Sequence, residues 1–412
     1  MFKSVKKWFL PLVFIMVTAL TIAGCTSNTT AATSTTTTPT TTKPITTTPT
    51  VTSPPTTVVP TTTAPATTPA PTTAKPTVTP ATVLTQPVNL NGAGGTFPAP
   101  LYTKWFSEYY YTSGAKINYA AVGSGAGINQ ITAGTVDFGA SDAIMTADQQ
   151  KAAETAGGPI LHIPMTSGAV AIVYNLPNIA SGQIKLTGDV LAKIYLKTIT
   201  TWNDPQITAL NPGLTLPNTP IAVVHRSDGS GTTYIFTNYL SKVSTDWSTK
   251  VGNATAVNWP GDIGGQGNAG VAGQVQQITG AIGYVELAYA EQNKIPWALL
   301  KNVAGNYEAP SLAGTTKASE GITLPDDMKV MITNSTNPDA YPICGFTWIL
   351  AYVNQTDKVK GQALVNMLWW AIHDGQQYSA ALDYAPLSSA AVAKAENEIL
   401  SIKYQGQSLL SR

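Results

Sequence analysis

One short segment, Arg226-Ser227-Asp228-Gly229-Ser230-Gly231-Thr232, combines residue types that bind oxyanions in proteins. The planar guanidinium of Arg226 can donate two parallel hydrogen bonds to one tetrahedral anion, and Asp228 is close enough in sequence to orient it. The segment follows a predicted strand and opens a predicted helix, whose first N–H groups have no partner within the helix and attract negative charge. Ser230 and Thr232 add hydroxyl groups. The segment indicates an anion site, with a structural Arg–Asp pair as the alternative interpretation.

Two further glycine-rich segments precede predicted helices, Gly92-Ala93-Gly94-Gly95-Thr96-Phe97 and Gly123-Ser124-Gly125-Ala126-Gly127. Glycines allow backbone N–H groups to approach a ligand closely, and Thr96 and Ser124 each contribute a hydroxyl. Each segment on its own is more typical of a helix cap. Three such segments in one chain, one of them containing an arginine, favour a shared binding site.

A fourth segment, Gly139-Ala140-Ser141-Asp142, places a carboxylate after a predicted strand at 136–138. A carboxylate repels an anion unless the anion carries a proton that it can donate. Phosphate has one or two protons near neutral pH and sulfate has none, so a dry carboxylate accepts a hydrogen bond from phosphate and faces sulfate unpaired. Asp142 therefore predicts selection of phosphate over sulfate. The alternative interpretation is that Asp142 caps the following helix.

The strands and helices around these segments determine how they are positioned. From Val88 onward, the sequence predicts strands that alternate with helices. Strands are expected at 88–90, 116–121, 136–138, 160–164, 169–174, 221–225 and 282–285. Helices are expected at 99–113, in a short segment ending at 133, and at 147–156, 189–196, 232–240 and 363–372. The alternation predicts an α/β protein with a mostly parallel sheet, in which ligands bind beyond the carboxyl ends of the strands. Roughly 325 residues suit two lobes better than one core.

The composition gives no support for nucleic-acid binding or metal chemistry. The formal net charge is +1 and only 11% of residues are charged, so the chain lacks the basic field that attracts nucleic acid. The three histidines, His162, His225 and His373, lie far apart, and neither a metal site nor a cofactor is expected. Cys344 has apolar neighbours and is expected to be a small buried thiol, with a reactive role as the alternative. We expect a monomer.

Residues 1–87 have the composition of a targeting signal followed by a tether, and not that of a folded domain. An apolar run at 8–20 follows three lysines and is too short for a stable membrane span. Thr21-Ile22-Ala23-Gly24-Cys25 resembles the lipobox of bacterial-type lipoproteins, which implies a signal peptide at 1–24, lipidation of Cys25 and an extracytoplasmic, membrane-anchored protein. An ordinary secretory signal with an incidental cysteine is the alternative. From 26 to 87 the chain is about two-thirds Thr and Pro, without Asp, Glu or aromatic residues, which predicts a disordered tether.

Taken in order, these motifs resemble those of the phosphate-binding proteins that supply ABC-type phosphate importers. The resemblance covers nearly all of the chain from Val88 to its end. It rests on the segments 92–100, 136–142 and 226–232, on Trp259-Pro260 with 264–268, and on 280–286 and 382–385. One segment departs, because the family often has Gly-Ser-Ser-Gly-Gly where this chain has Gly123-Ser124-Gly125-Ala126-Gly127.

The resemblance implies a two-lobed clamshell of the periplasmic-binding-protein type at 88–412, each lobe a mixed, mostly parallel sheet flanked by helices. The chain would cross the hinge twice, with one lobe at about 88–162 and 340–412 and the other at about 163–339. Asp142 would accept the phosphate proton, and Asp228 would orient Arg226. The other implied phosphate ligands are the Thr96 hydroxyl and N–H, the Phe97 N–H, Ser124, Arg226, Ser230, the Gly231 N–H and Thr232.

The function implied is extracytoplasmic binding of inorganic phosphate and its delivery to the transmembrane subunits of an ABC-type permease, without covalent chemistry. A binder of another tetrahedral oxyanion, or a phosphate sensor on the same scaffold, is the alternative. A secreted phosphatase is more remote, since the sequence has no Gly-x-Ser-x-Gly elbow, no metal-ligand cluster and no Walker loop.

Overall fold

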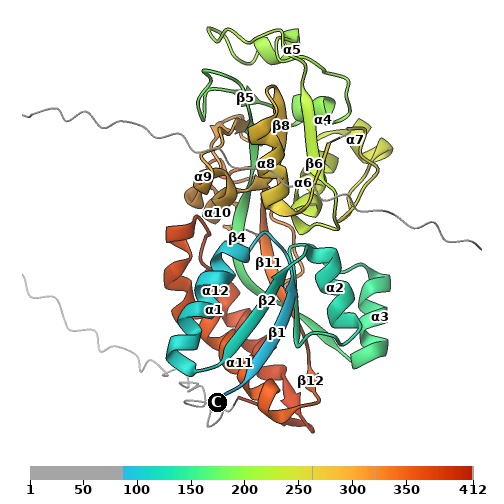
Figure 1. Ribbon diagram of the computed structural model, residues 1–412, viewed down its shortest axis with the longest axis vertical. Helices are drawn as coiled ribbons and strands as arrows, with labels where there is room; N and C mark the ends of the chain where they lie inside the picture. The colour runs from blue at the N-terminus through green and yellow to red at the C-terminus, as the bar shows by residue number, and fades with distance from the viewer. Residues whose placement is uncertain (1–86, 262, 321, 411–412) are drawn as a thin grey trace, which may run out of the picture. The chain divides into compact units, whose positions relative to one another are not determined.

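A computed structural model describes residues 87–261, 263–320 and 322–410 of the chain (Figure 1). The predicted signal peptide, Cys25 and nearly all of the predicted tether lie outside these residues, so the expectations about them stay predictions. Among the helices of the described part, none is both long enough and apolar enough to cross a membrane.

The strands and helices alternate along the chain as the sequence predicts. The strands are β1 Asn89–Gly94, β2 Lys116–Ala121, β3 Phe138–Ser141, β4 Ile160–Tyr174, β5 Lys185–Leu186, β6 Ala222–Arg226, β7 Ile263–Gly265, β8 Ala281–Glu286, β9 Leu299–Lys301, β10 Tyr307–Glu308, β11 Cys344–Tyr352, β12 Asn354–Gln355, β13 Lys403–Tyr404 and β14 Gln407–Ser408. The α-helices are α1 Ala99–Ser113, α2 Ser124–Thr132, α3 Ala147–Gly157, α4 Gly188–Tyr195, α5 Pro205–Thr208, α6 Gly231–Val243, α7 Thr245–Lys250, α8 Gly267–Gln277, α9 Leu287–Gln292, α10 Leu312–Ser319, α11 Lys358–Ile372 and α12 Ser389–Ser401, with 3-10 helices at Asp374–Tyr378 and Ala380–Leu382.

One eight-stranded sheet, with the order β2-β1-β3-β11-β4-β8-β6-β7, carries the fold. β1 is parallel to β2 and β3, and β6 is parallel to β7 and β8, whereas β11 and β4 run antiparallel to their neighbours. β4 pairs with β11 from Ile160 to Ala169 and with β8 from Val170 to Tyr174, so it passes from one half of the sheet to the other. Figure 1 shows β4 and β11 side by side between the elements of these two halves. The expected mixed α/β fold is confirmed.

The prediction of two separate strands at 160–164 and 169–174 is wrong, because both belong to β4. Pro164 and Gly168 interrupt the apolar pattern and favour a break in the sequence. In the structure the β4–β11 register shifts between Thr347 and Trp348, which pair with Thr166 and Pro164, so Met165 is an extra residue on β4. Such a bulge lets a strand continue through a residue that cannot donate to the ladder.

Three predicted loops are also corrected by the structure. β1 continues through Gly94, α2 begins at Ser124 inside the second glycine-rich segment, and Gly139–Ser141 belongs to β3 rather than to a loop after it. The glycines serve close packing here. A Cβ on Gly127 would lie 2.6 Å from the Gly94 Cα and 2.7 Å from the carbonyl oxygens of Ala93 and Ala140. Glycine in a strand or helix at such a contact marks a close backbone approach rather than a turn.

Gly127→Ala is therefore expected to lower the free energy of unfolding by about 1–3 kcal/mol, because its methyl group overpacks α2 against β1 and β3. Gly273→Ala is the matched control, since a Cβ there meets no atom within 4 Å on helix α8. It is expected to raise stability by about 1 kcal/mol through helix propensity. Urea unfolding of both variants measures the difference, and equal stability of Gly127→Ala and the parent chain would contradict the close packing.

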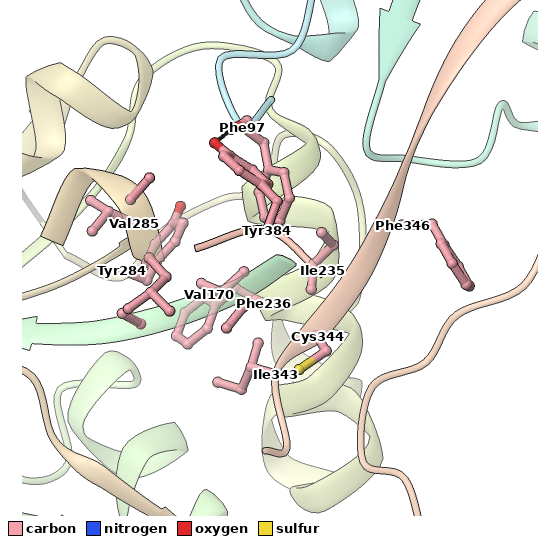
Figure 2. Packing of buried hydrophobic residues seen from close by; sticks show 14 of the residues in the cluster. Phe97, Val170, Ile235, Phe236, Tyr284, Val285, Ile343, Cys344, Phe346 and Tyr384 are labelled. Atoms are coloured by element: carbon pink, nitrogen blue, oxygen red, sulfur yellow. Dashed lines mark hydrogen bonds between the residues drawn. The ribbon is translucent and has the colours of Figure 1, made fainter. Parts of the chain in front are cut away.

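A continuous apolar core connects both halves of the sheet, and its largest fully buried side chains include Trp105, Trp202, Trp247 and Trp348. Cys344 lies in this core and is not in a disulfide (Figure 2). Its thiol donates to the Tyr341 carbonyl oxygen at 3.3 Å, and burial raises the pKa of the thiol to about 12. The prediction of a small buried thiol is confirmed.

Candidate anion-binding site

Three strand ends and three helix starts bring most of the predicted site residues to one place. Thr96 follows β1, Asp142 follows β3 directly, and Arg226 is the last residue of β6. Helices α2, α6 and α8 begin at Ser124, Gly231 and Gly267, and the N–H groups of their first turns have no partner within their own helices. Hydrogen bonds join these elements: the Gly231 N–H donates to Ser124 Oγ at 3.1 Å, and the Asn268 N–H donates to Thr96 Oγ1 at 3.2 Å.

Asp142 is almost fully buried and accepts hydrogen bonds on both carboxylate oxygens. Thr347 donates to Oδ1 at 2.7 Å and Ser124 donates to Oδ2 at 3.3 Å. Burial raises the pKa of Asp142 to about 7, while the bonds from Thr347 and Ser124 and the charge of Arg226 oppose this rise. The alternative interpretation of Asp142 as a helix cap is not what the structure shows, because Thr146 caps α3.

Arg226 is held in a fixed orientation by Asp228. Its Nε and Nη2 atoms donate to the two carboxylate oxygens at 2.8 and 2.5 Å, and Nη1 donates to Thr232 Oγ1 at 3.3 Å. Burial favours a neutral Asp228, but the bonds from Arg226 hold the pKa of Asp228 below its ordinary value. These contacts use three of the five guanidinium N–H groups, so two more hydrogen atoms can serve a ligand.

The remaining predicted residues, Phe97 and Ser230, bond to their own surroundings. Ser230 Oγ accepts from the Thr233 N–H at 3.0 Å and so caps α6. The Phe97 carbonyl oxygen accepts from Tyr384 OH at 2.6 Å, and Figure 2 shows the two side chains next to each other. Phe97 adjoins Thr96 in sequence and Ser230 adjoins Gly231, but these two bonds do not connect either residue directly to the buried cluster of Thr96, Ser124, Asp142, Arg226, Gly231 and Thr232.

Two residues of the cluster, Thr347 and Asn268, could not be assigned a role from the sequence. Thr347 lies in the middle of β11 and is far in sequence from every glycine-rich segment. Its hydroxyl group in an otherwise apolar strand is the one feature of the sequence that could have indicated a role. Asn268 lies within a segment that carried the family resemblance, but its position on the first turn of α8 gives no role by itself. Its side chain is fully buried between Thr96 and Thr232.

A cavity of about 300 Å³ opens beside the cluster, and Thr96, Asp228 and Tyr289 are among the residues that line it. Gly267, the first residue of α8, also lines this cavity, whereas Asp142 and Arg226 are not among its lining residues. Donors therefore converge from a guanidinium, from hydroxyl groups and from helix N-termini, which is the arrangement of an anion site. Within the described residues, no group of three or more His, Cys, Asp or Glu side chains is placed to hold a metal ion.

Comparisons with known proteins agree with this arrangement. A family model described as a PBP superfamily domain matches residues 26–364. The phosphate-binding protein PstS of Xylella fastidiosa (strain 9a5c) is 44% identical over 314 residues, which are 76% of this chain and 85% of that protein. PstS of Pasteurella multocida (strain Pm70) is 44% identical over 312 residues, which are 75% of this chain and 89% of that protein.

A solved structure of a high-affinity periplasmic phosphate-binding protein bound with phosphate, PfluDING, has a similar fold. Its TM-score is 0.62 at 22% sequence identity, over 75% of this chain and 93% of that chain. The expected periplasmic-binding-protein fold is confirmed, while the boundaries of the two lobes stay a prediction. The extent and identity of the sequence matches show that this chain belongs to the PstS family of phosphate-binding proteins, within the PBP superfamily.

Proposed function

We propose that this chain binds inorganic phosphate outside the cytoplasm and delivers it to the transmembrane subunits of an ABC-type importer. The names of its relatives, which are phosphate-binding proteins, support the ligand. The ligand set proposed is Thr96, Phe97, Ser124, Asp142, Arg226, Ser230, Gly231 and Thr232, with Asp228 orienting Arg226. The proposed role is reversible binding without catalysis.

The observation that carries the proposal is the burial of Asp142 among groups that donate hydrogen bonds. Arg226, the hydroxyl groups and the N-termini of α2 and α6 favour an anion. A buried carboxylate in the same cluster disfavours every anion that cannot donate a proton to it. Phosphate satisfies both requirements because one molecule presents oxygen acceptors to the donors and an O–H to the carboxylate.

The attachment proposed is a lipid on Cys25, followed by the Thr- and Pro-rich segment as a tether. Two or three acyl chains give stable anchoring, whereas a single chain does not. A tether of this composition would let the binding domain move beside the importer while staying at the membrane. We propose a monomer, since one chain supplies every residue of the proposed ligand set.

Calorimetric titration of the purified chain lacking residues 1–25 tests the ligand. Phosphate and arsenate are expected to bind with similar affinity, because both carry a proton near neutral pH. Sulfate and molybdate are expected to bind at least about 100-fold more weakly, which corresponds to the loss of one charged hydrogen bond and an unpaired buried carboxylate. Equal affinity for sulfate and phosphate would reject the proposal in favour of a general oxyanion binder.

A further inference from the structure

Asn268 lies at the centre of the cluster, yet each of its polar atoms bonds to protein. Its side chain is fully buried on the first turn of α8. The side-chain nitrogen Nδ2 donates to Thr96 Oγ1 at 2.9 Å and to Thr232 Oγ1 at 3.1 Å, which uses both of its hydrogen atoms. The Asn268 backbone N–H also donates to Thr96 Oγ1, at 3.2 Å.

The orientation of this amide is fixed by the backbone of β8. Asn268 Oδ1 accepts from the Glu286 N–H at 3.0 Å. If the amide were rotated by half a turn, two donors would face each other at Glu286, and an acceptor would replace the donor at the threonines. The buried N–H of Glu286 therefore selects the orientation in which Nδ2 points to Thr96 and Thr232.

The threonine hydroxyls consequently have only one way to use their own hydrogen atoms. A hydroxyl has two lone pairs and one hydrogen. Thr96 Oγ1 accepts two bonds from Asn268, and Thr232 Oγ1 accepts one from Asn268 and one from Arg226 Nη1 at 3.3 Å. Backbone, amide and guanidinium N–H groups cannot accept in return. Each hydroxyl hydrogen must therefore point away from these donors, to a further acceptor.

We propose that Asn268 is a positioning residue that makes the Thr96 and Thr232 hydroxyls obligate donors to the bound anion. The inference rests on the proposed function, because it needs an anion at this cluster. Asn268 acts through the two threonines, since its own N–H groups are used by them. Hydroxyls that cannot turn to accept favour ligand oxygens that accept a hydrogen bond over ligand O–H groups that would have to donate one. The site also loses no free energy in reorienting these hydroxyls when the ligand binds.

A double-mutant cycle with inorganic phosphate tests this coupling. Asn268→Leu keeps the branching and the number of heavy atoms of the side chain, but it removes one of the two N–H donors at each hydroxyl, so that each hydroxyl can reorient. It is expected to raise the Kd for phosphate by about tenfold. In a Thr96→Val/Thr232→Val background the same substitution is expected to change the Kd less than about twofold, because the groups through which Asn268 acts are gone. Equal effects of Asn268→Leu in both backgrounds would overturn the inference, as would an unchanged Kd in the parent background.

If the triple variant does not fold, the cycle of Asn268→Leu with Thr232→Val alone decides the question. Coupling above about threefold supports the inference, and additivity overturns it. Asn302→Leu is the matched control, because Asn302 is also buried and its amide bonds only backbone groups, of Pro338, Ala340 and Asn306. Asn302→Leu is expected to lower the thermal unfolding temperature and to leave the Kd for phosphate within twofold of the parent value. A tenfold rise in the Kd of this control would mean that the effect of Asn268→Leu comes from lost stability.

Phosphate titration of the parent chain distinguishes a failure of the proposed function from a failure of the role given to Asn268. Failure of the parent chain to bind phosphate would reject the proposed function itself. Phosphate binding by the parent chain together with an additive cycle would reject only the role of Asn268.

Discussion

Asp142→Asn is expected to weaken phosphate binding by about 100-fold and to reduce the preference for phosphate over sulfate by at least as much. The side chain keeps its shape, but its charge is lost and one of its oxygen acceptors becomes an N–H₂ donor. That donor no longer accepts the phosphate proton, and it offers sulfate a hydrogen bond where the carboxylate repels it. Calorimetric titration with both anions measures the two affinities at one pH.

Asp189→Asn is the matched control for this substitution. Asp189 is an exposed carboxylate on α4 that pairs with Lys193 at 2.9 Å, so the control removes the same charge away from the cluster. Its affinities are expected to match those of the parent chain. If Asp142→Asn kept both the phosphate affinity and the discrimination against sulfate, the carboxylate would not be the group that recognises the proton.

The same variant is expected to change how stability depends on pH in the absence of phosphate. Burial raises the pKa of Asp142 from 3.8 to about 7, so the folded protein keeps a proton there that the unfolded chain loses from about pH 4 upward. The contribution of this group to stability is present below about pH 4 and is lost as the pH rises towards 7. Asp142→Asn does not titrate, so it is expected to gain about 3 kcal/mol relative to the parent chain between pH 5 and pH 8. Urea unfolding at both pH values measures this gain, and a constant difference would contradict the raised pKa.

The largest loss of affinity is expected for Arg226→Met, at about 1,000-fold, because two charged hydrogen bonds of about 1.5–3 kcal/mol each are removed. The side chain of Arg226 is only 1% exposed, so water cannot replace it. The substitution also leaves the carboxylate of Asp228 without its main partner, which is expected to lower the free energy of unfolding by about 3–5 kcal/mol.

The double variant Arg226→Met/Asp228→Asn separates the two effects. Removing the uncompensated charge is expected to restore most of the stability, while the phosphate affinity stays low. Lys360→Met is the matched control, since Lys360 pairs with Asp137 at 2.9 Å but is 42% exposed, and such a pair is worth about 1 kcal/mol or less. Recovery of phosphate affinity in the double variant would show that Arg226 serves the fold and not the anion.

The local signals in the sequence predicted individual elements well. The helix at 99–113 is confirmed as α1, because Pro98 precedes it and Gly114 ends it with a left-handed φ of 73°. The strand at 116–121 is confirmed as β2. Proline at the first turn and glycine at the end are properties of a few consecutive residues, so no tertiary information is needed to interpret them.

Features that depend on distant parts of the chain could not be predicted in this way. Gly92 and Gly94 are typical of a turn, yet both lie in β1, because the ring of Phe138 and the backbone of Ala140 occupy the space of their side chains. The continuity of β4 depends on its pairing with β11, which is almost at the other end of the folded part. A glycine can serve either a turn or a close backbone contact, and which of the two applies depends on the neighbouring strand, which local sequence does not show.

The difference between local signals and contacts with distant parts of the chain also applies to the cluster around Asp142. The sequence predicted Arg226, Asp228 and the residues of the glycine-rich segments because each motif contains its own chemistry. It could not assign Thr347, whose hydroxyl reaches Asp142 only through the pairing of β11 with β3. Nor could it show that one amide, that of Asn268, contacts two hydroxyls from separate segments.

The position of β11 in the sheet has a consequence for synthesis of the protein. A ribosome completes β3 and β4 early, yet the strand that lies between them begins only at Cys344. The nascent chain therefore has two open strand edges in its first half until nearly all of it has been made, and open edges are templates for wrong pairing. Closing so long a loop is also slow. Completion of the central sheet is therefore expected to be a late step in the folding of this chain.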